Sequence, residues 1–328
     1  MIKIALDAMG GDNAPHEIIA GAVLARKHAD IDITLVGDQA RIEQTLVELK
    51  TDLKFPIIHT SEVVSMGDHP SDVLRKKKDA SIFVATRLVA EKRCDAVVSA
   101  GSTGAQMAGA IFILGRFKGI DRPGIGQVIP NVNGGFGLLC DAGAVADCKP
   151  LNLIQFALMA NAYAKSVMGF ENPRVALLNI GEEEEKGSEL AQETYKLLKK
   201  ANLNFTGNIE SKDLVKGIAD VYVSDGFTGN VVLKTVEGVA TSVMKLVKKA
   251  ATENLSGKIG GLFLKSNLGK VKRMFDYAEY GGAPLLGVNG ISIICHGRSN
   301  RVAIKSAIMQ AVKCVENDLV SKIIQATS

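Results

Sequence analysis

The feature that most constrains this chain of 328 residues is a regular alternation of short apolar runs with stretches of helical periodicity. Runs such as residues 2–6 and 96–98 are each followed by a polar loop that contains glycine, and then by a helical pattern. This alternation is typical of buried strands in a mostly parallel sheet with helices on both faces. We therefore predict an α/β protein with a three-layer α/β/α architecture.

The same patterns give approximate bounds for the elements. Strands are predicted at residues 2–7, 33–36, 55–59, 96–99, 125–130, 137–140, 174–179, 221–224 and 291–295. Helices are predicted at residues 15–28, 40–50, 80–93, 103–114, 150–168, 188–200, 229–251 and 301–326. Because no long linker, repeat or low-complexity tract interrupts this order, we expect residues 1–328 to form a single unit.

Composition argues against nucleic acid as a partner. The chain is 47% hydrophobic and 23% charged, as is usual for a soluble globular protein. Its net charge is only +4, and aromatic residues make up 5% with no Trp. Neither a strong electrostatic attraction nor a stacking platform for bases is therefore expected.

The cysteines and the lengths of the apolar runs indicate where in the cell the protein is expected. The five cysteines show no CxxC spacing, and an odd number in a large chain fits reduced thiols in a cytosol. The amino terminus has no signal-peptide pattern, and no run approaches the roughly 18 apolar residues that cross a bilayer. We expect a cytoplasmic protein whose contact with a membrane, if it has one, is peripheral.

Polar loops rich in glycine follow several predicted strands. Ligands of parallel sheets bind beyond the carboxyl ends of the strands, so these loops are the expected site. Glycine lets backbone N–H groups approach an anion, and the amino end of a following helix adds positive charge. The candidates in the first two loops are Asp7, Gly10, Gly11, Gly101, Ser102, Thr103 and Gly104. The alternative is a plain glycine turn with Ser or Thr as a helix cap.

Later loops add further candidates for the same cleft. Their side chains include carboxylates, an amide, a hydroxyl and cations, and a glycine allows close approach of the backbone. These candidates are Asp141, Asp225, Gly226, Thr228, Asn230, Lys234, His296 and Arg298. His296 stands in a glycine loop beside an arginine, which makes it the best candidate acid among the histidines. A histidine that only orders its loop is the alternative.

Sequence signatures of nucleotide, metal and serine-hydrolase sites are absent. There is no GxGxxG after the first strand, no GxxxxGK[ST], no GxSxG and no HExxH. The acidic run at 182–185 is interpreted as the solvated first turn of a helix, where negative charge suits the helix dipole. We therefore expect no cofactor and no metal.

Two cationic segments suggest partner surfaces. The compact run Arg75, Lys76, Lys77 and Lys78 is either a solvated helix face or a dock for an acidic protein or a phosphate-bearing arm. Residues 255–277 interleave apolar side chains with lysines, as in an amphipathic element on an anionic membrane. Its expected membrane contacts lie in a tip at 260–264 and are Leu262, Phe263 and Leu264. A dimer interface or a helix pair that caps the core is the alternative.

Eight motifs in this order resemble the bacterial phosphate acyltransferase family of phospholipid synthesis. They are DAMGGD at 7–12, SAGSTGA at 99–105, GIDRP at 119–123, DAGA at 141–144, NIGEEEEKG at 179–187, SDGFTGNVVLKTVEG at 224–238, YGGAPLLG at 280–287 and HGRS at 296–299. The resemblance extends over nearly the whole chain. The motifs at 224–238 and 280–287 together are highly specific.

This resemblance implies a fold, a reaction and partners. The fold is similar to the phosphotransacetylases and the isocitrate/isopropylmalate dehydrogenase-like proteins, in a homodimer. The reaction converts acyl–acyl carrier protein and inorganic phosphate to acyl phosphate and free carrier protein. A membrane acyltransferase then passes the acyl group to glycerol 3-phosphate. The segment 255–277 lies where the family carries a peripheral membrane element.

The chain departs from the family pattern at two places. Val145 follows the DAGA turn where the family usually has asparagine, so an amide contact with substrate is in doubt there. Ala80 and Ser81 stand where the family usually has two serines, so we assign no catalytic role to this pair.

Phosphate is already an anionic nucleophile and a thioester is already activated, so catalysis mainly requires positioning and oxyanion stabilisation. We expect Ser102, Thr103 and Asn230 to supply donors, with Lys234, Arg298 or His296 assisting the departing thiolate. We therefore expect the acyl group to pass directly to phosphate, without an acyl-enzyme intermediate. Competing interpretations are a short-chain phosphotransacetylase acting on acyl-CoA, a nicotinamide-dependent decarboxylating dehydrogenase, and a non-catalytic scaffold that binds acyl carrier protein.

Overall fold

The computed structural model describes residues 1–65, 67–68, 70–274 and 280–327. The strands are β1 (Ile2–Asp7), β2 (Ile31–Gly37), β3 (Ile57–His59), β4 (Ala96–Ser99), β5 (Gly124–Ile125), β6 (Gln127–Pro130), β7 (Phe136–Cys140), β8 (Arg174–Asn179), β9 (Asn204–Glu210), β10 (Val221–Val223), β11 (Ala283–Leu286) and β12 (Ile291–Ile294). The α-helices are α1 (His16–His28), α2 (Gln39–Glu48), α3 (Pro70–Lys76), α4 (Ser81–Ala90), α5 (Thr103–Gly109), α6 (Pro150–Ser166), α7 (Glu189–Leu198), α8 (Gly226–Ala250), α9 (Leu255–Met274), α11 (Arg301–Glu316) and α12 (Leu319–Thr327). A π-helical stretch η1 (Ala110–Leu114) continues α5, and a 3₁₀ helix η2 (Ser211–Lys216) follows β9.

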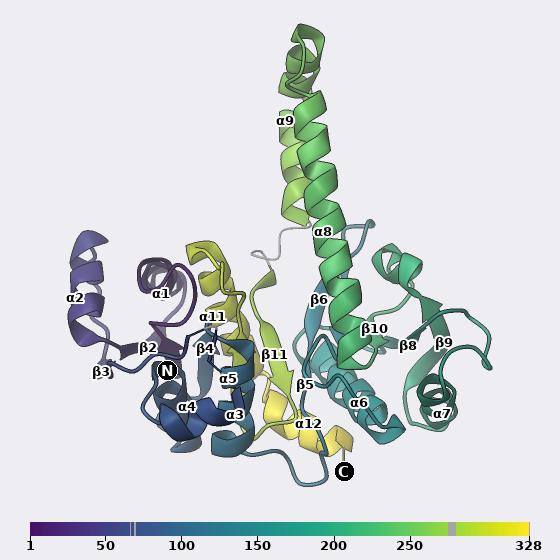
Figure 1. Cartoon of the computed structure of the whole chain (residues 1–328), viewed down its shortest axis with the longest axis horizontal. Helices are drawn as coiled ribbons and strands as arrows, with labels where there is room; N and C mark the ends of the chain where they lie inside the picture. The colour runs from purple at the N-terminus through teal and green to yellow at the C-terminus, as the bar shows by residue number, and fades with distance from the viewer. Residues whose placement is uncertain (66, 69, 275–279, 328) are drawn as a thin grey trace.

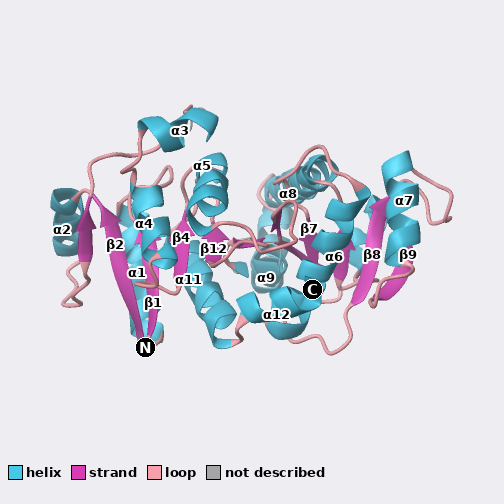
Figure 2. Ribbon diagram, turned by 90° about the horizontal axis from the view of Figure 1, so that it is seen from below, coloured by secondary structure: helices cyan, strands magenta, loops and turns pink. Residues whose placement is uncertain are grey.

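Two mostly parallel sheets stand side by side (Figure 2). The first sheet has seven strands in the order β3-β2-β1-β4-β12-β11-β5, and the second has five in the order β6-β7-β10-β8-β9. Only the pairs β11–β12, β11–β5 and β6–β7 are antiparallel among the described strands. The predicted strand–helix alternation is thus confirmed, and its strands divide between two sheets.

The register of the first sheet brings three loops to one edge. β1, β4 and β12 are parallel neighbours, with Leu6 level with Val98 and Ser99 level with Ile294. The polar loops that follow these strands therefore emerge at the same end. This arrangement places the loops around Asp7 and Ser102 next to the 296–299 loop.

Gly126 marks the crossing from the first sheet to the second. Ile125 pairs with Leu285 of β11, whereas Gln127 pairs with Leu139 of β7. The single strand predicted at 125–130 is therefore two strands in two sheets. Helix α12 also connects the halves, because it packs against α6 beside the second sheet.

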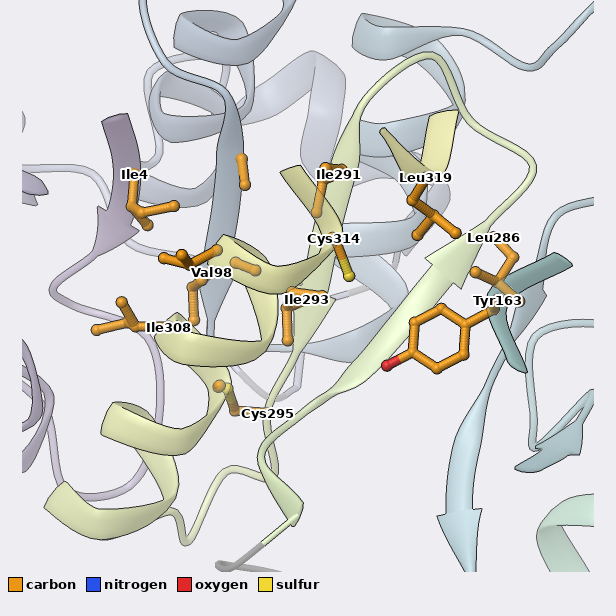
Figure 3. Packing of buried hydrophobic residues seen from close by; sticks show 14 of the residues in the cluster. Ile4, Val98, Tyr163, Leu286, Ile291, Ile293, Cys295, Ile308, Cys314 and Leu319 are labelled. Carbon is orange, nitrogen blue, oxygen red and sulfur yellow. The ribbon is translucent and has the colours of Figure 1, made fainter. Parts of the chain in front are cut away.

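The hydrophobic core lies on both faces of the sheets. In β1, Ile4 and Leu6 face the cluster built with α1 and α11, and Ala5 faces the cluster built with α4. Val97 in β4 and Tyr222 in β10 also face the α4 side, opposite to their strand neighbours. This alternation with a period of two residues is what a strand covered on both faces requires. Figure 3 shows part of the first cluster, including Ile4, Val98, Ile293 and Ile308.

Polar residues at loop ends cap several helices. The side chains that accept a hydrogen bond from the first turn are Asp38 for α2, Ser102 for α5, Ser188 for α7, Asp225 for α8 and Asn300 for α11. Such caps satisfy backbone donors that have no partner inside the helix. Three of these caps stand in loops that the sequence pattern marks as site loops.

Helices α8 and α9 project from the body as an antiparallel hairpin (Figure 1). Gly257 and Gly261 allow close approach near the turn, because a Cβ there would lie 2.6 Å from Ala250 O or 3.1 Å from Ala251 O. The connecting turn is at residues 251–254, so the predicted tip at 260–264 lies within α9 instead. The last part of the predicted amphipathic segment, 275–277, falls outside the described residues. No described helix is both long enough and apolar enough to cross a bilayer.

Other elements also differ from the prediction. β9 and β11 were not expected, and the long final helix at 301–326 is divided into α11 and α12. The division falls at Asn317 and Asp318, where Asp318 has φ of 47°. A left-handed residue ends the regular helix, so α12 leaves in a new direction.

Candidate active site

The buried carboxylate of Asp7 organises the loops at the edge of the first sheet. Ser99 Oγ donates a 2.7 Å hydrogen bond to Oδ2, and the Met9 N–H donates one of 3.2 Å to Oδ1. The Ser81 hydroxyl, at the start of α4, and the Gly10 N–H also donate to this carboxylate. We refer to Asp7, Gly10, Ser81, Ser99 and Gly101 as the Asp7 cluster.

Burial dominates the electrostatics of Asp7. Removal from water raises the pKa of this carboxyl, and the hydrogen bonds from Ser81, Ser99 and the backbone act in the opposite direction. Because the hydrogen bonds of Asp7 come from its own chain, the carboxylate shapes the loops.

Glycines let the loops of the Asp7 cluster meet backbone to backbone. A Cβ on Gly10 would lie 2.4 Å from Asp7 Oδ2 and 2.8 Å from Gly101 N. Gly11 has φ of +105°, and a side chain there would meet Gly297 O at 3.1 Å. The Asp12 N–H donates a 2.7 Å bond to the same Gly297 O. The loops after β1, β4 and β12 thus form one continuous surface.

The amino end of α5 lies beside this surface. Ser102 Oγ accepts a hydrogen bond from the Ala105 N–H at 3.4 Å, and the Gly101 N–H donates to Ser99 Oγ at 3.0 Å. Thr103 is exposed, and Ser102 and Gly104 are half-buried. Accessible hydroxyls and first-turn N–H groups are what a phosphate or a developing oxyanion requires.

His296 and Arg298 are exposed on the loop after β12. The Arg298 N–H donates a 3.1 Å hydrogen bond to His296 Nδ1, so the neutral ring carries its proton on Nε2. Asn13 Nδ2 donates to the Arg298 carbonyl at 3.3 Å and thereby ties this loop to the one after β1. The loop that carries both residues therefore stands next to the Asp7 cluster.

A second cluster of candidates stands on the second sheet. The Asp141 carboxylate is fully buried and accepts backbone hydrogen bonds from Ile125, Gly143, Ala144 and Val145 at 2.7–3.1 Å. Desolvation raises its pKa, and these four N–H groups oppose the shift. Asp141 is therefore saturated by its own loop and by Ile125 of β5, and it holds the loop in a fixed shape.

The start of α8 packs directly on the Asp141 loop. A Cβ on Gly226 would lie 2.5 Å from Asp141 Oδ2, and one on Gly229 would lie 2.0 Å from Asp141 O. Asp225 caps this helix by accepting from the Thr228 N–H at 2.8 Å. Asn230 is exposed and lies over Gly143. Hydrogen bonds thus join Asp141, Asp225, Gly226 and Thr228 within this loop and helix start, and Asn230 packs beside them over Gly143.

Lys234 lies two turns along α8 from this helix start. Its Nζ forms an ion pair of 2.8 Å with Glu237 Oε2. This pairing leaves Lys234 less suited to assist a departing thiolate than His296 or Arg298.

The basic run lies beside the Asp7 cluster. Helix α3 packs against α5, and Lys78 precedes Ser81 by three residues, a span of at most about 10 Å. Arg75 and Lys78 are exposed, whereas Lys77 pairs with Asp68 at 2.6 Å. Positive charge is therefore available at the edge of the site.

The three residues expected at a membrane are exposed on α9. Leu262 is 72% exposed, Phe263 80% and Leu264 52%. Val243 and Leu246 of α8 are also exposed, at 49% and 66%. The hairpin therefore presents apolar side chains that this chain does not cover.

Burial keeps the cysteines from acting as nucleophiles. Desolvation raises the pKa of Cys148 to about 11 and that of Cys295 and Cys314 to about 12. It also raises the pKa of Cys94 and Cys140. All five thiols are thus protonated at neutral pH, and a thiol acyl-enzyme is disfavoured.

One group of carboxylates lies close together away from these loops. Oxygens of Glu182, Glu210 and Asp213 lie within 4.8 Å of one another. Lys212 pairs with Glu210, and Lys216 pairs with Asp213. The lysines already compensate part of this charge.

Ser81 and Ser99 are the site residues that the sequence prediction missed. Both are almost fully buried and both donate to Asp7. Ser99 directly precedes the second glycine loop, which was the available signal. Ser81 stands at a position where the family usually has serine but was given no role, because no local pattern shows a contact with Asp7 that spans 74 residues of chain.

Comparison with known sequences points to one family. The family described as "Fatty acid synthesis protein" matches residues 2–322. A phosphate acyltransferase of Desulfitobacterium hafniense (strain Y51) is 52% identical over 324 residues, which cover 98% of this chain and 96% of that protein. A phosphate acyltransferase of Clostridioides difficile (strain 630) is 47% identical over 328 residues, which cover 100% and 96%.

Solved structures share the fold at low identity. A phosphotransacetylase from Streptococcus pyogenes gives a TM-score of 0.64 at 18% identity, covering 96% of this chain and 94% of that chain. A 4-hydroxythreonine-4-phosphate dehydrogenase from Klebsiella pneumoniae gives 0.56 at 12% identity, covering 96% and 100%. These likenesses concern the fold alone. They confirm the predicted similarity to phosphotransacetylases and to a dehydrogenase-like fold.

Proposed function

Because this chain belongs to the phosphate acyltransferase family, we propose that it transfers a fatty-acyl group from acyl carrier protein to inorganic phosphate. The products are acyl phosphate and the free carrier thiol. The acyl phosphate then supplies phospholipid synthesis, through a membrane acyltransferase that acts on glycerol 3-phosphate.

The observation that best supports this proposal is the amino end of α5 beside the Asp7 cluster. Ser102 and Thr103 offer hydroxyl and backbone donors there, and Gly10 and Gly101 keep the neighbouring loops close. A phosphate dianion and the oxyanion of a thioester adduct both require such donors. His296 and Arg298 add a proton donor and a cation on the adjoining loop.

Direct transfer accounts for the reaction in two bond changes. A phosphate oxygen attacks the thioester carbonyl carbon, and the carbonyl oxygen takes up the electron pair as an oxyanion. The adduct collapses, the carbon–sulfur bond breaks, and the carrier thiolate departs. The His296 Nε2–H donates a hydrogen bond to this thiolate, or the Arg298 guanidinium stabilises its charge, and the proton that phosphate loses converts the thiolate to the free thiol. Positioning and oxyanion stabilisation supply most of the rate enhancement.

The second cluster offers another donor set in this proposal. Asn230 and Thr228 lie at the amino end of α8, over a loop that Asp141 holds in place. We assign Asn230 a contact with the thioester substrate. Asp7, Asp141 and Asp225 serve as loop-positioning residues, because a carboxylate facing phosphate would be repulsive.

The basic run suits docking of an acidic carrier protein. Arg75, Lys76, Lys77 and Lys78 precede α4, whose first residue, Ser81, contacts Asp7. A carrier held there would deliver its thioester arm to the edge of the Asp7 cluster. Complementary charge would mainly increase the association rate.

The hairpin supports a homodimer and a peripheral membrane contact. Val239, Val243 and Leu246 form an exposed stripe on α8, for which a second copy of the chain is the proposed cover. Leu262, Phe263 and Leu264 of α9 are proposed to contact lipid, with lysines of α9 facing anionic head groups.

A direct assay tests the reaction. Palmitoyl–acyl carrier protein is incubated with and without phosphate, and free thiol is followed together with hydroxylamine-trappable acyl phosphate. Both products should appear only with phosphate. Ser102→Ala should lower kcat/KM by roughly 10- to 100-fold, since one donor near the developing charge is lost. Ser211→Ala, an exposed serine on η2, is the matched control and should leave kcat/KM unchanged.

Other outcomes identify the alternatives. Thiol release without phosphate would indicate a thioesterase. Turnover of acetyl-CoA in preference to the carrier substrate would indicate a short-chain phosphotransacetylase. An acylated serine or cysteine recovered after incubation with the thioester alone would contradict direct transfer.

A further inference from the structure

A groove of about 420 Å³ lies between α11 and the second sheet. Residues of α11, the carboxyl end of α6, and strands β6 and β7 line it. The volume falls within the range of roughly 300–1,000 Å³ that small-molecule sites occupy. None of the predicted site residues belongs to this lining.

Apolar and polar side chains share the walls of the groove. Val128 and Phe136 come from the edge of the second sheet, and Val167 and Met168 follow α6. Phe136 is 37% exposed although it begins a core strand. Met309 of α11 forms part of the opposite wall. Unbranched methionines adapt to irregular apolar ligands, so these walls suit an alkyl chain.

One buried donor in the lining has no acceptor among the described residues. Tyr163 is 1% exposed, and its hydroxyl oxygen accepts a 2.8 Å bond from Gln310 Nε2. Gln310 Oε1 accepts from the Gly282 N–H at 2.9 Å, which fixes the orientation of the amide. Within the described chain, the Tyr163 proton therefore has no partner. Figure 3 shows its hydroxyl oxygen pointing toward the carboxyl-terminal part of the chain.

Such a donor favours a ligand oxygen. Burial raises the pKa of Tyr163 above its usual range, so the hydroxyl keeps its proton at neutral pH. A buried donor without an acceptor costs free energy. A carbonyl, carboxylate or phosphate oxygen in the groove would satisfy it.

The charge of the lining favours an anion. Lys305 and Lys313 both face the groove, eight residues apart on α11, a rise of about 12 Å. In the part of the chain that the structure describes, neither ammonium group forms an ion pair, and the lining contains no acidic side chain. His28 adds a third basic side chain at the groove.

We propose that this groove binds a single-chain anionic amphiphile, with its alkyl chain along Phe136, Met168 and Met309 and its head group beside Lys305 or Lys313. A fatty carboxylate and an acyl phosphate share this chemistry. The site is separate from the Asp7 cluster. The proposal of this binding site therefore does not depend on the transfer reaction.

Displacement of bound cis-parinaric acid from the full-length protein, followed by fluorescence, tests the proposal. Palmitate and hexadecylphosphonate, a stable mimic of an acyl phosphate, should both displace the probe, and the stronger of the two identifies the preferred head group. Hexadecanol should displace it at least tenfold more weakly, because it lacks charge. Equal displacement by hexadecanol would overturn the assignment of an anionic ligand.

Variants locate the bound probe. Lys305→Gln combined with Lys313→Gln should weaken palmitate binding about tenfold or more, the effect of losing one charged hydrogen bond. Lys322→Gln, an exposed lysine on α12, is the charge-matched control and should leave it unchanged. Met309→Trp should fill the groove and abolish probe binding, and Met168→Trp is the second filling variant if the first misfolds. Unchanged probe binding in a folded filling variant would overturn the proposal and place the amphiphile on the exposed hairpin.

Discussion

Two glycines of α8 have opposite surroundings, and this contrast gives a prediction. A Cβ on Gly229 would lie 2.0 Å from the Asp141 carbonyl oxygen, whereas Gly238 has nothing within 4 Å. Gly229→Ala should therefore destabilise the fold by more than about 2 kcal/mol, because the backbone must move. Gly238→Ala should stabilise it by roughly 0.5–1 kcal/mol, since alanine favours the helix. Urea unfolding of both variants checks this prediction. Similar stabilities for the two would contradict the packing of α8 on the Asp141 loop.

The ion pair between Glu17 and Arg301 predicts a pH dependence. The Arg301 guanidinium approaches Glu17 Oε1 to 2.5 Å and, through its hydrogen bonds, lowers the pKa of that carboxyl from 4.5 to about 2. The stabilisation is therefore fully present above pH 4.5 and is lost as the pH falls toward 2. Glu17→Gln should cost about 1 kcal/mol at pH 7, because solvent partly screens the pair. This cost should shrink at pH 3. A cost that is the same in urea unfolding at pH 7 and pH 3 would rule out the charge as its cause.

Single residues also mark how far sequence alone predicts the site. The glycine loops around Asp7 and Ser102 were predictable, because a polar loop at the end of a buried strand is a local pattern. The saturation of Asp141 by four backbone N–H groups was not, because Ile125 lies 16 residues earlier in another sheet. Hydrogen bonds between distant segments depend on topology, which no local pattern contains.

At the scale of elements, the buried central strands were the easiest to predict. β1 and β4 are mainly apolar, with Lys3 the one charged residue before Asp7 in β1. In contrast, β9 is the polar edge segment NFTGNIE and β11 lies inside the loop-like motif YGGAPLLG. Edge strands and strands rich in glycine and proline lack the apolar signal of a core strand. The division of the final helix depends on one left-handed residue, Asp318, which the apolar stripe conceals.

Helix α9 gives a prediction about membranes. Replacing Leu262 and Phe263 by Asp should lower the binding of the protein to anionic vesicles by about tenfold or more, because two apolar side chains no longer enter the lipid. Cosedimentation with phosphatidylglycerol-containing vesicles measures the effect. Val47→Asp, which changes a 77% exposed side chain of α2, is the control and should bind as the wild type does.

A result on the same variant separates lipid contact from self-association. Unchanged vesicle binding, together with loss of the dimer, would show that Leu262 and Phe263 face another protein chain. The proposed membrane contact would then be wrong.

At the scale of the whole molecule, the stripe on α8 predicts the oligomeric state. Val239, Val243 and Leu246 are 57%, 49% and 66% exposed and recur at helical spacing. The wild type should be a dimer, and Val243→Glu combined with Leu246→Glu should be a folded monomer at micromolar concentration, because charges oppose burial of the stripe. Sedimentation velocity measures this. Ile180→Glu, at a 79% exposed position on the body, is the control. A double variant that stays dimeric would place the interface elsewhere.

The division of the strands between two sheets could not be predicted from the hydrophobic pattern of the sequence. The alternation of strands and helices predicted a mostly parallel sheet, but Gly126 carries the chain from one sheet to the other within a single apolar run. Nothing in that run distinguishes a long strand from two short ones, since both satisfy the same hydrophobic pattern.

The length of the α8–α9 hairpin sets the distance between the body of the molecule and any surface that the turn contacts. α8 has 25 residues, so it extends about 37 Å from the Asp141 loop, and α9 returns the chain alongside it. Because the helices are antiparallel, seven residues removed from each at the same height would shorten the projection by about 10 Å and rejoin at nearly the same place. The length of the hairpin can thus change without a change in the body of the molecule. It sets how far the body stands from whatever surface the turn meets, independently of the sheets that build the site.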